Sequence, residues 1–274
     1  MGRAAARPGR RARAGADAGA QAVGGGRAAL GTTADADTIR DTAIAQPLLV
    51  ATALASARAL GMGSGQVGLV AGHSVGEFAA AALAGVVTEH EAVRLVSVRG
   101  RAMADAAAAS EPTSMAAVLG GEPSEVEAAI ARLGLTAANM NGAGQVVAAG
   151  SKAGIESLVA EPPARARVIE LQVAGAFHTT YMAPAVDTLR AAAANVSAQD
   201  PHIALLSNAD GSVVASGTDA IERLVRQVAN PVRWDLCMDA MAAQGVTGII
   251  ELAPGGVLTG LAKRALKDIP AVPL

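Results

Sequence analysis

The chain has 274 residues and a formal net charge of −2, from 22 Lys and Arg against 24 Asp and Glu. Nucleic-acid-binding proteins usually carry a basic face, so we expect no nucleic-acid partner. Hydrophobic residues make up 51% of the chain and aromatic residues only 1%, which predicts a core of Ala, Val, Leu and Ile. The single cysteine, Cys237, excludes a disulfide framework and a cysteine-based zinc cluster, and indicates a cytoplasmic protein.

The first part of the chain differs from the rest. Residues 1–33 are mostly Ala, Gly and Arg and show neither helical nor strand periodicity. Such a segment buries too little apolar surface to offset its ordering entropy, so we predict a disordered or aberrant N-terminal segment. It lacks the apolar region of a secretory signal. The apolar run over 43–60 is interrupted by Gln46, Pro47 and Arg58, so we expect no membrane span.

Residues 34–113 are predicted to form the first half of an α/β core. Pro47 predicts a helix that begins there and runs to Gly61. The apolar run over 66–72 predicts a buried strand at the centre of a parallel sheet. Two helices should follow, over 75–85 and 88–108.

The second of these helices has a start signal of its own. Thr88 and Glu91 have the spacing of a capping box, in which each side chain bonds the backbone of the other residue.

Over residues 114–174 the sequence pattern changes to short alternating strands and helices, which predicts an inserted subdomain. Strands and helices alternate there in the order β-α-β-β-α-β, over 115–121, 123–134, 135–140, 145–150, 152–160 and 166–173. This is the order of a ferredoxin-like fold, and it would form one wall of a cleft. The core then resumes over 175–274 with predicted elements at 180–194, 202–208, 218–229, 235–244, 247–252 and 254–266.

The stretch Gly72-His73-Ser74-Val75-Gly76 matches the G-x-S-x-G nucleophile elbow. An apolar strand precedes it and an Ala-rich helix follows. The sharp turn would leave no space for a Cβ at either glycine and would push the Ser74 hydroxyl out of the sheet. It also places the Val75 N–H at a helix start, where the N–H is free to stabilise an oxyanion.

A serine nucleophile needs a base, and the chain offers four histidines. The ring of His73, beside Ser74, should point away from it, and His90 and His202 are predicted to be surface or edge residues. His178 lies in a short loop after the predicted subdomain, where it can face the elbow.

The sequence pattern does not single out the third member of a triad, the group that orients the histidine. Asp187 and Asp200 are candidates only by position. A backbone carbonyl that accepts the Nδ1–H can orient an imidazole equally well.

Several further motifs, in order, resemble one family. They are "GHSVGE", "VRGRAM", "NMNGAGQVVAAG", "GAFHTTYM", "NPVRW" and "ELAPGGVLTGLAKRAL". Over roughly 34–270 the chain is similar to the malonyl-CoA:acyl-carrier-protein transacylases of fatty-acid and polyketide synthesis. The resemblance implies an α/β-hydrolase-like core with a parallel sheet and an inserted ferredoxin-like subdomain. It also implies a cytoplasmic, monomeric enzyme without metal or cofactor, whose partners are malonyl-CoA and acyl carrier protein.

The resemblance also implies roles for particular residues. Ser74 would be the acylated nucleophile of a ping-pong transfer and His178 its general base. Arg99 would bind the malonyl carboxylate, and the backbone carbonyl of Gln227 would orient the histidine. The remaining substrate contacts implied are Val75, Phe177, Asn139 and Asn141, with the bulk of Phe177 favouring malonyl over branched acyl groups.

The chain departs from the family pattern at its start. Family members begin with an apolar strand and a Gly-Gln-Gly turn that supports the oxyanion, and residues 1–31 contain neither. Our hypothesis is an altered reading frame or a wrongly chosen start. Two alternatives therefore stay open. One is a catalytically impaired homologue, and the other is a serine hydrolase or thioesterase, although in that class the histidine usually lies nearer the C-terminus.

Overall fold

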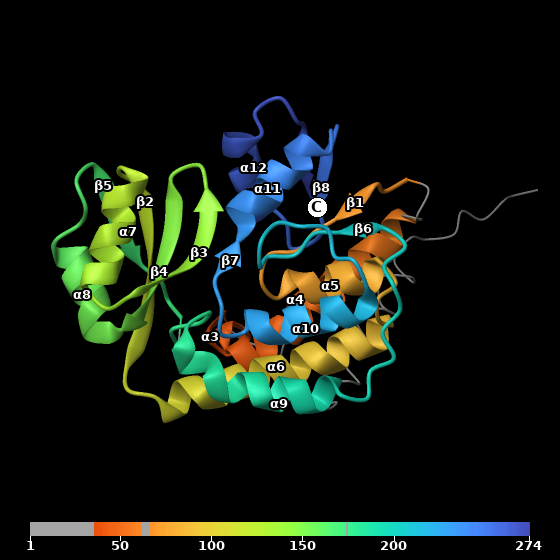
Figure 1. Cartoon of the computed structure of the whole chain (residues 1–274), viewed down its shortest axis with the longest axis horizontal. Helices are drawn as coiled ribbons and strands as arrows, with labels where there is room; N and C mark the ends of the chain where they lie inside the picture. Colours follow the sequence, from red (N-terminus) through yellow and green to blue (C-terminus); the bar gives the residue numbers. More distant parts are fainter. Residues whose placement is uncertain (1–35, 62–65, 174) are drawn as a thin grey trace, which may run out of the picture.

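The computed structural model describes residues 36–61, 66–173 and 175–274 (Figure 1). The segment 1–33, for which we predicted disorder, lies outside the described residues. The chain has the mixed α/β fold that the sequence predicts. A five-stranded sheet with two helices forms one part, and a helical layer with two short parallel sheets forms the other.

The five-stranded sheet has the strand order β5-β2-β4-β3-β7. Its strands are β2 (Thr113–Gly120), β3 (Thr136–Gly142), β4 (Gln145–Ser151), β5 (Ala166–Glu170) and β7 (Val232–Arg233). All neighbours are antiparallel except β3 and β7, which are parallel. Helices α7 (Pro123–Arg132) and α8 (Lys152–Ala160) pack on this sheet through a small apolar core that includes Ile155 and Leu158.

The elements β2, α7, β3, β4, α8 and β5 follow one another along the chain, so the first four sheet positions come from one continuous segment. Strand β7 comes from a distant part of the chain and joins at the edge. It brings the residues just after α10 beside β3. The domain boundaries at 114 and 174 stay a prediction.

The helical layer surrounds the main core, which is built largely of Ala, Val and Leu as the composition predicts. Its helices are α3 (Ala36–Arg40), α4 (Thr42–Leu60), α5 (Gly76–Leu83), α6 (Glu89–Ala109), α9 (Ala183–Ala193) and α10 (Gly217–Gln227). A short 3-10 helix, η1 (Thr180–Met182), leads into α9. Helix α6 packs between α4 and α9 (Figure 1).

Two short parallel sheets complete the fold. One pairs β1 (Leu69–Val70) with β6 (Ala204–Leu205), and the other pairs β8 (Ile249–Glu251) with β9 (Ala271–Pro273). Helices α11 (Trp234–Ala243) and α12 (Val257–Ala265) pack beside them.

The prediction of a fully buried central strand over 66–72 is wrong. Only Leu69 and Val70 form the strand, and both are half-buried. In the described part of the chain β1 has β6 as its one partner. A cavity of about 760 Å³ is lined by residues of β1 and β8 and, among the described residues, by none of β6.

The prediction that helix α4 begins at Pro47 is also wrong. The helix begins at Thr42, because the Asp41 side chain caps it by accepting the Ala43 N–H at 2.8 Å. Pro47 therefore lies in the second turn. By length and composition alone α4 would pass as a membrane span, but Val50 and Leu54 are buried in the core against other helices.

The capping box of α6 is confirmed. The Thr88 side chain accepts the Glu91 N–H at 3.1 Å, and the Glu91 carboxylate accepts the Thr88 N–H at 2.9 Å. This cap fixes the start of the helix that carries Arg99.

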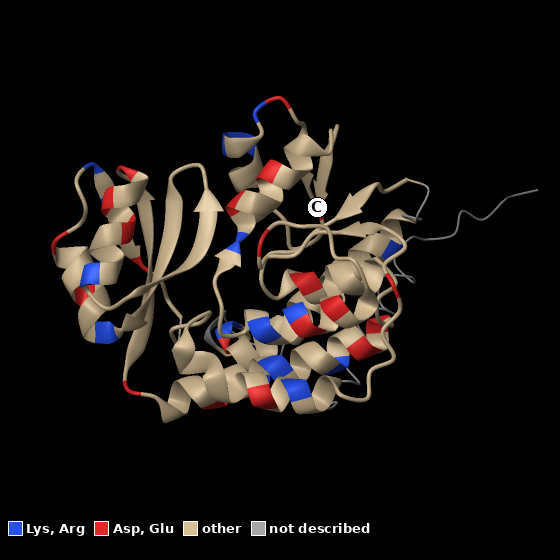
Figure 2. Cartoon of the chain, viewed as in Figure 1, with Lys and Arg blue, Asp and Glu red and all other residues tan. Residues whose placement is uncertain are grey.

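Charged residues lie mainly on the helices, with both signs intermixed along α6, α9 and α10 (Figure 2). Strands β2, β3 and β4 carry none.

Candidate active site

The nucleophile elbow lies between β1 and α5, and Ser74 has a φ of 51°, in the left-handed region that a non-glycine residue rarely adopts. A Cβ added at Gly72 would lie 2.0 Å from the Gly76 carbonyl carbon, so the turn requires a glycine there. The same expectation for Gly76 is wrong. In the described part of the chain the space within 4 Å of a Cβ at Gly76 is open, apart from its own helix backbone and chain neighbours.

Ser74 and His178 face each other across the site, with the Ser74 Oγ 2.7 Å from the His178 Nε2. The His178 Nδ1 lies 2.9 Å from the backbone carbonyl of Gln227. A carbonyl can only accept, so Nδ1 carries the hydrogen and Nε2 is left to accept the serine proton. His178 is itself in the left-handed region, with a φ of 61°. Two strained residues facing each other are typical of a functional site.

Burial sets the charge of His178. Loss of solvation, helped by the nearby Arg99 charge, lowers the pKa of His178 to about 3. The imidazole is therefore neutral near pH 7, which is the state a general base requires.

Arg99 is 1% exposed, and its guanidinium lies beside the Ser74 hydroxyl. Its Nη2 donates to the Ser74 Oγ at 3.1 Å and to the Gln227 Oε1 at 3.0 Å, and its Nη1 donates to the Gln46 Oε1 at 2.6 Å. Within the described residues the Arg99 Nε has no hydrogen-bond partner and no carboxylate is ion-paired with the group. Burial lowers the pKa of Arg99 to about 10, opposed by Glu77, so the group stays a cation near pH 7.

Sequence reasoning missed Asn208, which is 0% exposed and bonds the first and the central residue of the elbow. Its Oδ1 accepts the Ser74 N–H at 2.7 Å, and its Nδ2 donates to the Gly72 carbonyl at 2.8 Å. Nothing in "HIALLSN" marks this residue, because the contact spans 134 positions along the chain.

Glu77 was also missed as a site residue, although it lies in "GHSVGE". Its carboxylate accepts the Asn208 N–H at 2.7 Å and a short hydrogen bond from the Gln227 Nε2. An acidic residue in a first helical turn usually faces solvent, so the sequence carries no signal of this burial.

The other predicted substrate contacts lie around the elbow. The Asn141 Oδ1 is 2.8 Å from the His73 Nε2, and the His73 ring lies edge-on to Trp234, away from Ser74 as predicted. Asn139 is buried in β3 opposite Val232 of β7.

Two further predicted contacts flank the reacting groups. Phe177 is half-buried against the core beside His178. The Val75 N–H has no partner among the described residues and lies at the start of α5, where an oxyanion would bind.

The remaining candidates lie apart from the site. His90 and His202 are exposed, as predicted. Asp187 is exposed on α9, and the Asp200 carboxylate accepts the Gly217 N–H, so neither orients His178.

The 760 Å³ cavity reaches Gly72, Val75 and Gly76 but not Ser74, His178 or Arg99. In the part of the chain that the structure describes, no group of three His, Cys, Asp or Glu side chains could hold a metal ion.

The geometry can perform one kind of chemistry. A neutral imidazole can deprotonate the Ser74 hydroxyl, and a free N–H beside it can stabilise the oxyanion of a tetrahedral intermediate. These groups have the arrangement that a serine-dependent acyl transfer would require, with a buried cation next to the Ser74 hydroxyl.

Comparisons with known proteins agree with that class. The family model described as the acyl transferase domain matches residues 28–273. The malonyl CoA-acyl carrier protein transacylase of Mycobacterium tuberculosis is 51% identical over 233 residues, which cover 84% of this chain and 77% of that protein.

Solved structures are similar as well. A crystal structure of MCAT from Mycobacterium tuberculosis has a TM-score of 0.92 and 48% identity, covering 96% of this chain and 88% of that one. A structure described as a type II PKS acyl-carrier protein in complex with its malonyl-transacylase has a TM-score of 0.87 and 29% identity, with coverages of 96% and 87%.

The chain is thus an acyltransferase by fold and family. Within that class it belongs to the family of the malonyl CoA-acyl carrier protein transacylases.

Proposed function

We propose that the chain transfers a malonyl group from malonyl-CoA to the phosphopantetheine thiol of acyl carrier protein through a malonyl ester of Ser74. The observation that carries this proposal is the buried Arg99 guanidinium, 3.1 Å from the Ser74 hydroxyl and without an ion-paired carboxylate in the described residues. A malonyl thioester carries a free carboxylate close to its reacting carbonyl. A guanidinium binds a carboxylate through two parallel hydrogen bonds, so Arg99 selects this substrate and orients it.

The first half-reaction acylates the serine. The His178 Nε2 takes the Ser74 proton as the hydroxyl oxygen attacks the thioester carbonyl, and the Val75 N–H stabilises the oxyanion. The tetrahedral intermediate collapses, coenzyme A leaves, and the proton on His178 passes to its thiolate. The Gln227 carbonyl holds the imidazole in the correct tautomer throughout.

The second half-reaction reverses the first with another thiol. The phosphopantetheine thiol gives its proton to His178 and attacks the malonyl ester, and the proton then returns to Ser74. The names of the relatives and the carrier-protein complex of one structural neighbour support acyl carrier protein as the acceptor.

The remaining assignments complete the proposal. Asn139 and Asn141 would line the path of the pantetheine arm, and Phe177 would exclude branched acyl groups beside His178. We place the protein in the cytoplasm as a monomer that supplies extender units for fatty-acid or polyketide synthesis.

The test is direct. Incubation with radiolabelled malonyl-CoA followed by denaturing electrophoresis should show a labelled protein, and Ser74→Ala should carry no label. Added holo acyl carrier protein should discharge the label onto its own thiol. Rapid loss of the label to water without a carrier protein would favour the hydrolase alternative, and absence of label in the wild type would refute the proposal.

A further inference from the structure

Gln227 lies between His178, Arg99 and Glu77 and contacts each of them through a different atom. Its backbone carbonyl accepts the His178 Nδ1–H at 2.9 Å, and its side-chain Oε1 accepts Arg99 at 3.0 Å. Its Nε2 donates to Glu77 and, at 3.2 Å, to the Asn208 Oδ1. One amide therefore connects the carboxylate of Glu77 to the guanidinium of Arg99.

Hydrogen-bond chemistry allows this amide only one orientation. A guanidinium can only donate, and the carboxylate of Glu77, when ionised, can only accept. The Gln227 amide must therefore present its oxygen to Arg99 and its NH₂ to Glu77. Glu77 cannot turn away, because its Oε1 accepts the backbone N–H of Asn208 at 2.7 Å.

We propose that Glu77 is a positioning residue of this site: by accepting the Gln227 NH₂ it holds the Gln227 oxygen toward Arg99 and so fixes the guanidinium beside Ser74. The inference rests on the proposed function, because it assigns to Arg99 the binding of the substrate carboxylate. Glu77 touches neither the substrate nor the reacting atoms, and it acts through Gln227.

The substitution Glu77→Gln tests this with a side chain of the same shape. The Asn208 N–H still requires an acceptor, so the new amide must turn its oxygen to Asn208 and its NH₂ to Gln227. Gln227 must then rotate to offer its oxygen, which turns its own NH₂ toward Arg99. Two donors then face each other, and Arg99 loses its acceptor and its fixed position.

The expected loss is selective. In Glu77→Gln, kcat/KM for malonyl-CoA should fall by about 10- to 100-fold, the size expected when a hydrogen bond to a charged group is lost. Reaction of Ser74 with the neutral reagent phenylmethanesulfonyl fluoride uses His178 as base and requires no carboxylate binding by Arg99, so its rate should change far less, by less than about threefold. In an Arg99→Ala background Glu77→Gln should have no further effect on malonyl transfer, because residues acting as one unit are not additive.

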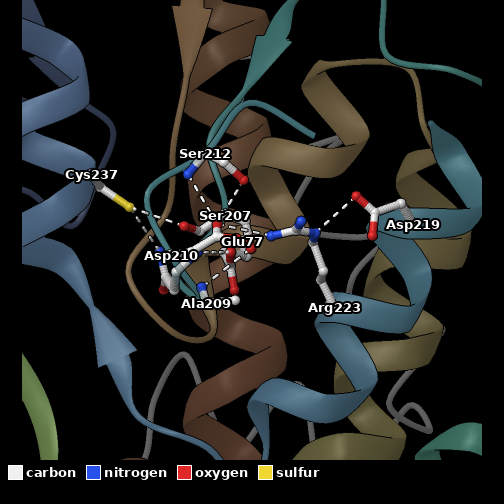
Figure 3. Close-up of polar contacts among 9 residues, drawn as sticks. Glu77, Ser207, Ala209, Asp210, Ser212, Asp219, Arg223 and Cys237 are labelled. Atoms are coloured by element: carbon white, nitrogen blue, oxygen red, sulfur yellow. Dashed lines mark hydrogen bonds and ion pairs between the residues drawn. The ribbon is translucent and has the colours of Figure 1, made fainter. Parts of the chain in front are cut away.

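A pH profile supplies a readout that mere packing would not move. Burial raises the pKa of Glu77 to about 8, against the pull of the Asn208 N–H, Arg99 and Arg223. The charged or titratable groups that interact with it electrostatically are Arg99 from α6, Arg223 from α10 and Cys237 from α11. Figure 3 shows Glu77 with Arg223 and Cys237, and with Asp210, whose carboxylate pairs with Arg223. Wild-type kcat/KM should rise as Glu77 ionises near pH 8, and Glu77→Gln should lack that rise.

The matched control is Glu251→Gln. Glu251 is also a buried carboxylate, but it accepts the N–H groups of Gly256, Leu258 and Thr259 at the start of α12, away from Ser74. This control should keep the preference for malonyl-CoA. If Glu77→Gln fails to fold, Gln227→Met removes the amide while keeping the carbonyl that holds His178, and it should show the same selective loss.

The outcomes separate the two proposals. A wild type that forms no malonyl-serine overturns the proposed function and this inference together. A wild type that forms it, beside a folded Glu77→Gln protein with unchanged selectivity, overturns this inference alone. Equal slowing of malonyl transfer and of the neutral reagent also overturns it, because Glu77 would then support the whole site and not Arg99.

Discussion

The five-stranded sheet and the nucleophile elbow are held in shape by different kinds of hydrogen bond. Strand β2 is paired on both sides by backbone ladders with β4 and β5. At the elbow, β1 pairs through two of its residues in the described part of the chain, and the Ser74 N–H bonds the Asn208 side chain. Backbone ladders survive most side-chain changes, whereas the elbow depends on a few particular side chains. The regions should therefore respond differently to substitution.

The largest effect is expected at Gly72. Gly72→Ala places a Cβ 2.0 Å from the Gly76 backbone, which should cost more than about 3 kcal/mol of unfolding free energy or prevent folding. Gly76→Ala is the control, since its Cβ meets nothing in the described residues. Urea denaturation of both proteins measures the difference, and equal stabilities would show that the elbow is not the tight turn described above.

The second comparison uses one substitution in each region. Asn208→Ala leaves the Ser74 N–H and the Gly72 carbonyl buried without partners, at a cost of about 2–4 kcal/mol. Leu158→Ala, under the five-stranded sheet, creates a cavity of similar cost, about 2–5 kcal/mol.

Their activities should diverge. Labelling of Ser74 by malonyl-CoA, measured per folded molecule, should slow at least tenfold in Asn208→Ala and stay unchanged in Leu158→Ala. Equal activity in the two variants would mean that the hydrogen bonds of the Asn208 side chain to the elbow do not affect the labelling reaction.

The third prediction concerns pH and the base. Folding lowers the pKa of His178 from its ordinary 6.5 to about 3. Between these values the unfolded chain binds a proton that the folded chain does not, so stability falls as the pH falls from 6.5.

This dependence is at most about 1.4 kcal/mol per pH unit for one proton. His178→Gln should flatten that part of the stability curve in urea titrations at pH 4 to 7. If the slopes of the two proteins coincide, His178 is not buried in its neutral form.

The smallest effect is expected at the cap of α6. Thr88→Ala should cost about 1 kcal/mol without altering the preference for malonyl-CoA, because Arg99 lies three turns further along the helix. A thermal melt together with a comparison of malonyl-CoA and acetyl-CoA measures both quantities. A change of selectivity would show that the position of Arg99 depends on how the start of its helix is capped as well as on its immediate contacts.

Local patterns predicted much of the fold. The order of elements over 113–170, the capping box of α6 and the Ala-rich core all follow from periodicity, turn residues and composition. Short parallel strands were predicted too long or, for β7 and β9, not at all. Their pairing partners lie far away in the chain, so no local pattern sets their length.

The site divides in the same way. Ser74 is marked by its own neighbours, because a strained turn needs glycine beside it. Arg99 and Gln227 were identified only by resemblance to a family, since an arginine or glutamine in a helix is ordinary by itself.

By itself, the sequence determined where the chain turns sharply, which helices form and which hydroxyl lies in the strained turn, because these depend on residues within a few positions of one another. Only the tertiary structure decided what surrounds that hydroxyl. His178, Asn208 and Gln227 meet Ser74 because separate elements pack around one point, and burial there keeps His178 neutral near pH 7.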